Sequence, residues 1–140
     1  MLLIMDDAAH LREVGLRVTA ARLAILESVR VGDHLDAEHV ARSVRTKVGH
    51  VSTQAVYDGL HALAGAGLIR RIEPAGSPAR YEARVGDNHH HLVCRTCGKV
   101  TDVDCVVGRA PCLEPSRTHG YTVDEAEVVF WGVCPSCQKK

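Results

Sequence analysis

Two Cys-x-x-Cys pairs constrain this chain more than any other feature of its 140 residues. One pair is Cys94 and Cys97, and the other is Cys134 and Cys137. Each pair suits a tight turn that aims both sulfurs at one point, and four such thiolates close a tetrahedron around a zinc ion. The spacing therefore predicts a structural Zn²⁺ site that holds part of the fold together.

Disulfides are the alternative reading of the six cysteines. The apolar start of the chain is too short for a signal peptide and acidic residues follow it at once. No stretch is long enough to span a membrane. We therefore expect a cytoplasmic chain, where such pairs bind metal more often than they form disulfides. Cys105 and Cys112 lie outside the quartet and are either two buried small side chains or a thiol switch.

The composition predicts two small domains that need support beyond a hydrophobic core. Hydrophobic residues make up 46% of the chain but aromatic residues only 4%, and thin cores often depend on a metal or a partner subunit. A net charge of +0 argues against broad binding to polyanions but allows local basic patches. Every cysteine follows residue 93. This break predicts domains at 1–83 and 89–140, joined by a hinge at 84–88.

Three helices followed by a hairpin are predicted in the first domain. Thr19, Asp36 and Ser52 are placed to cap the helices, and Gly65 and Gly67 end the third. The hairpin pairs 68–73 with 79–83 around a turn at 74–78. Apolar residues with helical spacing give each helix an inward face: Leu23, Ile25, Leu26 and Val29; then Ala37, Val40, Ala41 and Val44; then Val56, Leu60 and Leu63.

This order of elements is typical of a winged helix-turn-helix, whose last helix enters the major groove of DNA. Hydroxyl and amide side chains on that helix suit base edges or phosphates, and Tyr57 suits a phosphate. Helices and a hairpin also occur in domains that bind no DNA, so the pattern alone leaves both readings open. The residues predicted to contact DNA are Arg17, Thr19, Arg22, Ser52, Thr53, Gln54 and Tyr57.

The second half alternates short strands with turns. Strands are predicted at 91–94 and 99–103, around the first cysteine pair, and within 121–133, before the second pair. A short helix is expected at 105–118, although Pro111 and Pro115 weaken it. His89 and His91 alternate along an extended segment and so share one face, with His90 on the other. The imidazole cluster suggests a second, more exchangeable metal site.

These pieces together resemble the ferric uptake regulator family, in the right order and over almost the whole chain. The added cysteines at 105 and 112 resemble the actinobacterial branch that controls catalase-peroxidase genes. The matching segments are Gly15–Arg22, Val51–Leu60, Gly67–Leu68, His89–Gly98 and Gly132–Cys137.

The resemblance implies an α+β protein that represses transcription and is not an enzyme. Its N-terminal winged helix would bind double-stranded operator DNA, and its C-terminal α/β domain would form a homodimer and hold the zinc. No membrane and no small-molecule substrate are implied. An exchangeable Fe²⁺ or Mn²⁺ would control DNA binding, and imidazoles with carboxylates suit such ions. Position by position, this regulatory site falls on His34, Glu82, His89, His91 and Asp102.

Asp102 points to the signal, because the peroxide-sensing branch carries Asp where iron sensors usually carry Glu. In that branch bound Fe²⁺ reacts with peroxide and an adjacent histidine ligand is oxidised, and the oxidised residues here would be His34 and His89. Glu82 departs from the Asp typical of peroxide sensors, and Asp58 departs from the Arg or Asn that often follows the tyrosine. The alternatives are an iron- or zinc-level repressor of the same family, or a thiol-based redox switch. His90, with Glu125 or Glu127, is a weaker candidate for a further metal site.

Overall fold

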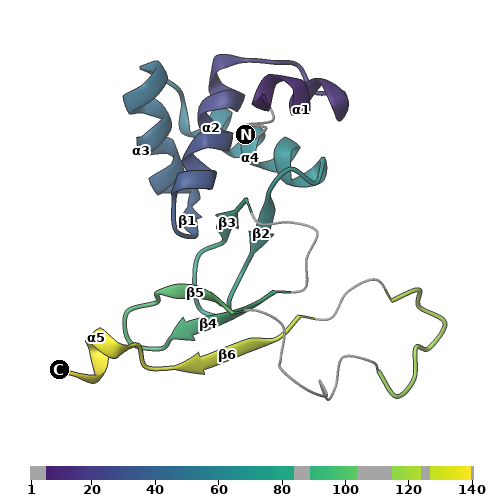
Figure 1. Ribbon diagram of the computed structural model, residues 1–140, viewed down its shortest axis with the longest axis vertical. Coiled ribbons are helices and arrows are strands. Elements are labelled where there is room, and N and C mark those ends of the chain that lie inside the picture. Colours follow the sequence, from purple (N-terminus) through teal and green to yellow (C-terminus); the bar gives the residue numbers. More distant parts are fainter. Residues whose placement is uncertain (1–5, 84–88, 104–114, 124–126, 140) are drawn as a thin grey trace, which may run out of the picture. The chain divides into compact units, whose positions relative to one another are not determined.

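The computed structural model describes residues 6–83, 89–103, 115–123 and 127–139. The chain divides into two compact units, Met1–Gly86 and Asp87–Lys140 (Figure 1). The predicted hinge at 84–88 lies outside the described residues, as do Cys105, Cys112 and Glu125. No helix in the described part of the chain is long and apolar enough to cross a membrane.

The helices of the first unit are α1 (Asp7–Glu13), α2 (Ala20–Val31), α3 (Ala37–Val48) and α4 (Thr53–Gly65). The predicted caps are confirmed, because the side chains of Thr19, Asp36 and Ser52 each accept a backbone N–H from three residues further on. Such caps satisfy amides that have no partner within the helix. Helix α1 is an addition to the prediction, since its seven residues are too few to show a helical period.

The core of the first unit lies between α2, α3 and α4, and the predicted inward residues are buried there except Leu23, which is half-buried. Helices α2 and α4 approach closely at Gly59, where a Cβ atom would lie 2.5 Å from Ile25 Cδ1. A larger residue at 59 would therefore displace the buried side chain of Ile25. Gly67 has φ +78°, which favours glycine and ends the α4 region as predicted.

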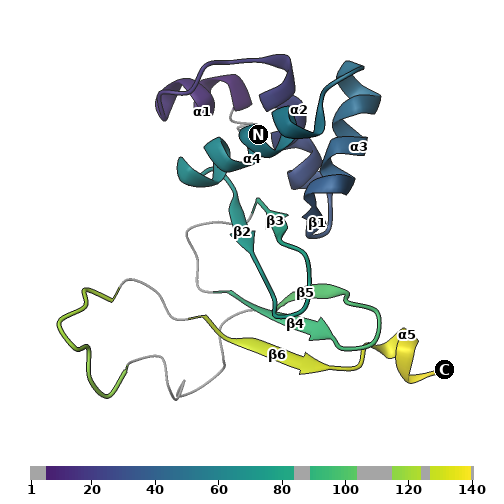
Figure 2. The ribbon, with the colours of Figure 1, turned by 180° about the vertical axis from the view of Figure 1, so that it is seen from behind.

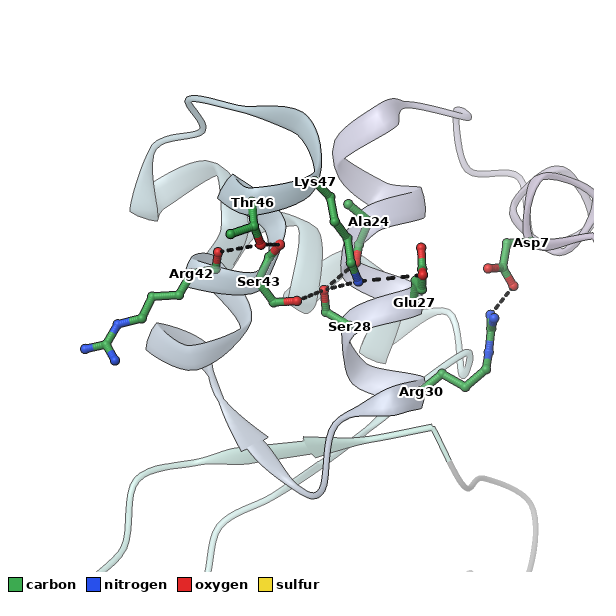
Figure 3. Close-up of polar contacts among 9 residues, drawn as sticks. All are labelled: Asp7, Ala24, Glu27, Ser28, Arg30, Arg42, Ser43, Thr46 and Lys47. Atoms are coloured by element: carbon green, nitrogen blue, oxygen red, sulfur yellow. Dashed lines mark hydrogen bonds and ion pairs between the residues drawn. The ribbon is translucent and has the colours of Figure 1, made fainter.

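A polar seam also joins α2 to α3 (Figure 3). Ser28 is fully buried; its hydroxyl donates to the Ala24 carbonyl at 2.7 Å and lies 2.8 Å from the Ser43 hydroxyl. Lys47 Nζ donates to Ser28 Oγ at 3.2 Å and lies 3.9 Å from Glu27. Because the buried Ser28 hydroxyl is partnered, its hydrogen bonds offset the cost of burying it and help to align the two helices.

A small three-stranded sheet completes the first unit. It contains β1 (Leu35–Asp36), β2 (Arg70–Ile72) and β3 (Arg80–Glu82), in the order β1-β3-β2 with antiparallel pairing. The predicted hairpin is confirmed in position, but its strands are shorter than 68–73 and 79–83. Strand β1 was not predicted because two residues carry no alternation. It pairs Leu35 with Tyr81, which brings the segment before α3 to the wing.

The second unit contains β4 (His90–Cys94), β5 (Val100–Val103), β6 (Val129–Gly132) and α5 (Pro135–Gln138). Figure 2 shows its sheet from behind, with β4 between an antiparallel β5 and a parallel β6. The strand expected within 121–133 is confined to β6. Of the helix expected at 105–118, residues 115–118 are not helical, in keeping with Pro115, and residues 104–114 lie outside the description.

Candidate metal centres and nucleic-acid interface

The four predicted thiolates lie together in the second unit. Cys94 ends β4, Cys97 lies in the turn that follows, Cys134 directly precedes α5 and Cys137 lies within that helix. The Gly98 amide donates to the Cys94 carbonyl at 2.9 Å and closes the first turn. All four sulfur atoms lie within 4.8 Å of one another, so one ion can reach all of them.

The spacing of these sulfurs fits a zinc ion. Cys97 Sγ lies 3.8 Å from Cys134 Sγ. Ligands of a tetrahedral ion with bonds of about 2.3 Å are separated by about 3.8 Å. The amides of Cys97 and Cys134 point at Cys94 Sγ, at 3.5 and 3.3 Å, and stabilise its thiolate. None of the four cysteines forms a disulfide.

The charges of the cluster also favour a cation at its centre. The backbone amides of Cys134 and Cys97 lower the pKa of Cys94 to about 5. The hydrogen bond from the Cys137 thiol to Cys134, with burial, raises the pKa of Cys137 to about 12. Four neighbouring thiols therefore cannot all lose their protons unless a positive ion balances the charge. Cys94 is also only 5% exposed, whereas reactive thiols are partly accessible.

His34 and Glu82 meet within the first unit, next to the β1–β3 pairing. His34 Nε2 lies 3.1 Å from Glu82 Oε2, and both side chains are almost completely buried. The backbone of His34 is in the left-handed region, with φ 56°, and its carbonyl accepts a hydrogen bond from Arg80 Nη1 at 3.1 Å. A left-handed conformation is uncommon for a residue with a Cβ, so the surrounding structure holds it in place.

His89, His91 and Asp102 meet within the second unit. The antiparallel register places His91 opposite Asp102, with Nε2 3.3 Å from Asp102 Oδ1. His89 Nε2 lies 3.6 Å from the same oxygen, and the two imidazole rings pack edge to face with centroids 4.9 Å apart. Both histidines are buried and Asp102 is partly exposed.

The distances within each group suit ligands of a single divalent ion. Two ligands bound at about 2.1 Å to one ion lie about 3.0–3.4 Å apart in octahedral or tetrahedral geometry. The shorter contact in each unit, 3.1 Å for His34 with Glu82 and 3.3 Å for His91 with Asp102, falls in this range. Each unit therefore carries a partial set of nitrogen and oxygen donors, the kinds of ligand that suit Fe²⁺, Mn²⁺ and Zn²⁺.

The sequence left His90 equally open to solvent exposure and to metal binding, and the structure excludes solvent exposure. The side chain is only 2% exposed. Both ring nitrogens are buried without a hydrogen-bond partner among the described residues. Glu127 is exposed, and Glu125 lies outside the description.

The predicted DNA-reading face lies on the N-terminal half of α4, where Ser52, Thr53, Gln54 and Tyr57 are all exposed. Some of these side chains already have partners. Ser52 caps the helix, and Thr53 Oγ1 accepts from Arg45 Nη2 at 3.0 Å.

Asp58, which departs from the family pattern, is engaged rather than isolated. Gln54 Nε2 donates to Asp58 Oδ1 at 2.9 Å, one helical turn apart. Gln54 Nε2 is therefore already engaged on its own helix, and the contact of Gln54 with DNA stays a prediction.

The remaining predicted DNA contacts lie before and within the start of α2. Arg17 is exposed, while Arg22 Nη1 donates to the Arg17 carbonyl at 2.8 Å and Thr19 caps the helix. Sequence reasoning missed Arg45, whose Nε donates to the Val51 carbonyl at 3.0 Å. Arg45 thereby holds the loop that leads into α4. A basic residue in the last turn of α3 was the available signal.

The sequence model of the ferric uptake regulator family matches residues 13–130. The chain belongs to this family. The transcriptional regulator FurA of Mycobacterium tuberculosis H37Rv is 58% identical over 134 residues, which cover 96% of this chain and 91% of the relative. Ferric uptake regulation protein 2 of Mycolicibacterium fortuitum is 55% identical over 135 residues, covering 94% and 92%.

A solved structure shares the fold. The ferric uptake regulator of Helicobacter pylori, described as having three functional metal-binding sites, aligns with a TM-score of 0.72 at 22% identity. The alignment covers 96% of this chain and 90% of that one. The predicted α+β class is confirmed, and so is the prediction of a metal-dependent transcriptional regulator of this family rather than an enzyme.

Proposed function

We propose that this member of the ferric uptake regulator family is a homodimeric repressor that releases operator DNA in response to peroxide. The observation that carries the proposal is the pair of donor groups at ligand spacing, His34 with Glu82 and His91 with Asp102. With His89, these residues would hold one exchangeable Fe²⁺ or Mn²⁺. The two groups belong to different units of the chain.

In this proposal the zinc ion is structural. Cys94, Cys97, Cys134 and Cys137 hold it, supported by their common approach within 4.8 Å. A closed four-thiolate site leaves no open position for a reactant, so the zinc stabilises the second unit rather than taking part in sensing.

The regulatory ion acts through the orientation of the two units. Ligands drawn from both units give the ion-bound state contacts that the ion-free state lacks, so the ion shifts the population toward one orientation. That orientation would be the one in which a dimer presents both α4 helices to DNA.

Exposed residues of α4 would then read the major groove, and the segment before α2 would contact phosphates. The residues assigned to this contact are Arg17, Thr19, Arg22, Ser52, Thr53, Gln54 and Tyr57. Apolar side chains that remain exposed in the second unit support pairing with a second copy: Leu92, Phe130, Trp131 and Val133.

Peroxide sensitivity rests on the carboxylate at position 102. Bound Fe²⁺ would supply the reaction with peroxide that oxidises a neighbouring imidazole. The nearest candidates are His34, beside Glu82, and His89, beside Asp102. An oxidised ring is a poorer ligand, so the regulatory ion is lost and the dimer releases DNA.

An iron-level repressor is the second candidate function. It is favoured by the relatives themselves, which are named as ferric uptake regulation proteins and FurA. In that case ion concentration controls DNA binding, and low doses of peroxide leave the loaded repressor unchanged.

Titration of operator DNA with the Fe²⁺ and Mn²⁺ forms, before and after mild peroxide, separates the two functions. The peroxide sensor loses DNA only in the Fe²⁺ form, with one oxygen added to His34 or His89 by mass spectrometry. Equal loss in both metal forms contradicts iron-centred oxidation. Retention of DNA by both forms favours the iron-level repressor.

Two variants test the proposed parts separately. Tyr57→Phe should weaken operator binding because it removes a phosphate donor, while metal content stays unchanged. His34→Ala should lose the regulatory ion yet keep zinc. Sedimentation of the zinc-loaded protein should show a dimer, and a monomer would contradict that part of the proposal.

A further inference from the structure

The imidazole of His34 lies between two carboxylates of its own unit. Nδ1 is 2.8 Å from Asp33 Oδ1, and Nε2 is 3.1 Å from Glu82 Oε2. The ring is 6% exposed, whereas the Asp33 side chain is 73% exposed. Asp33 therefore reaches the buried ring from the solvent side, and Glu82 contacts it from within.

A neutral imidazole carries one proton and so donates to only one of these carboxylates. When an ion takes the lone pair of Nε2, this proton is on Nδ1, where it is donated to Asp33 Oδ1. The lone pair of Nε2 then faces Glu82, and two acceptors facing each other favour a cation between them. Hydrogen bonds of this kind set the tautomer of a metal-binding histidine.

The backbone holds the ring in this position. His34 has φ 56°, and Arg80, two residues before Glu82 on β3, donates to its carbonyl at 3.1 Å. Arg80 also pairs across the sheet with Asp36. The hydrogen bond from Arg80 and the pairing of Asp36 with Arg80 hold the His34 backbone against β3, the strand that carries Glu82. Asp33 therefore acts on a ring whose backbone is already fixed.

We propose that Asp33 is a positioning residue for His34: its carboxylate keeps the ring proton on Nδ1 and leaves Nε2 available to the regulatory ion. This inference rests on the proposed role of His34 as a ligand. Without Asp33, the proton moves to Nε2, where it is donated to Glu82. An incoming ion must then displace this hydrogen bond before it binds.

The test uses the full-length, zinc-loaded protein and the variants Asp33→Ala and Asp33→Asn. Glu38→Gln is the matched control, since Glu38 is an exposed carboxylate at the start of α3 with no contact to the ring among the hydrogen bonds and ion pairs described. Nitrogen-15 NMR of the His34 ring, without a regulatory ion and at a pH where the ring is neutral, reports the tautomer. Titration with Mn²⁺ alone reports affinity.

We expect the Nδ1–H tautomer in the wild type and the Nε2–H tautomer in Asp33→Ala, with Mn²⁺ affinity about 10- to 100-fold weaker. Asp33→Asn keeps an oxygen acceptor for Nδ1–H and should restore the wild-type tautomer and most of the affinity. Glu38→Gln should match the wild type in both measurements.

An unchanged tautomer or an unchanged Mn²⁺ affinity in Asp33→Ala overturns the role of Asp33. An equal loss of affinity in Glu38→Gln also overturns it, because the effect would then be one of general charge. His34→Ala distinguishes this failure from that of the proposed function. If His34→Ala binds Mn²⁺ like the wild type, His34 is no ligand and both proposals fall; if it loses Mn²⁺ while Asp33→Ala does not, only the role of Asp33 is wrong.

Discussion

The two units of the chain are stabilised in different ways. A continuous apolar cluster in the first unit runs from Leu11 on α1 through α2, α3 and α4 to Tyr81 on β3. Among the described residues of the second unit, only Val93, Cys94 and Val100 are buried apolar side chains. The first unit therefore has a hydrophobic core of its own, whereas the described part of the second has few buried apolar side chains and gains most from its metal cluster.

Loss of the zinc site should have the largest effect. Cys94→Ser removes the thiolate that receives two backbone amides, and structural zinc contributes on the order of 10 kcal/mol to the folding of a small domain. The second unit should unfold while the helical signal of the first persists in circular dichroism. A folded variant that keeps its zinc would remove the contrast between the units.

Acid should reproduce that loss in the intact protein. Backbone amides lower the pKa of Cys94 to about 5, well below the usual pKa of a cysteine thiol, so its thiolate favours the folded state above that usual pKa. This contribution declines as the pH falls toward the folded pKa and is lost below it. Zinc release, followed with a chromogenic chelator, should rise as the pH is lowered into the acid range and protons compete for the thiolates, while the helices of the first unit remain. Release already complete at neutral pH would contradict the assignment.

A core substitution in the first unit should show the opposite pattern. Leu60 is fully buried in α4, and Leu60→Ala should lower the free energy of unfolding by about 2–5 kcal/mol. Zinc content should not change, because the four thiolates belong to the other unit. Urea unfolding with parallel zinc analysis checks both expectations. Loss of zinc along with the helices would mean that the two units unfold together.

The smallest effect should come from a helix cap. Ser52→Ala removes the hydroxyl that accepts the Ala55 amide and should cost about 1 kcal/mol. Ser52→Thr, which keeps a hydroxyl acceptor, is the matched control and should be close to the wild type in thermal unfolding. The Ala variant should also weaken operator binding if the start of α4 reads DNA, and unchanged affinity would argue against that role for Ser52.

Patterns repeated along the sequence predicted much of the first unit. Helices α2, α3 and α4 have a capping residue and an apolar period, and both signals are local. Strand β1 and helix α1 were missed because two and seven residues are too short to carry a period. The sequence placed β6 only within 121–133, since a β-branched run shows where a strand can form but not where its partner strand ends.

The sequence by itself determined the cysteine quartet and the three main helices, because residue spacing and capping act over a few neighbours. The tertiary structure alone decided that β1 pairs with β3, which places His34 against Glu82. It also decided that Asp33 contacts the His34 ring and that Arg80 holds its backbone. Those contacts depend on a left-handed residue and on strand pairing across more than forty positions, for which no local pattern exists.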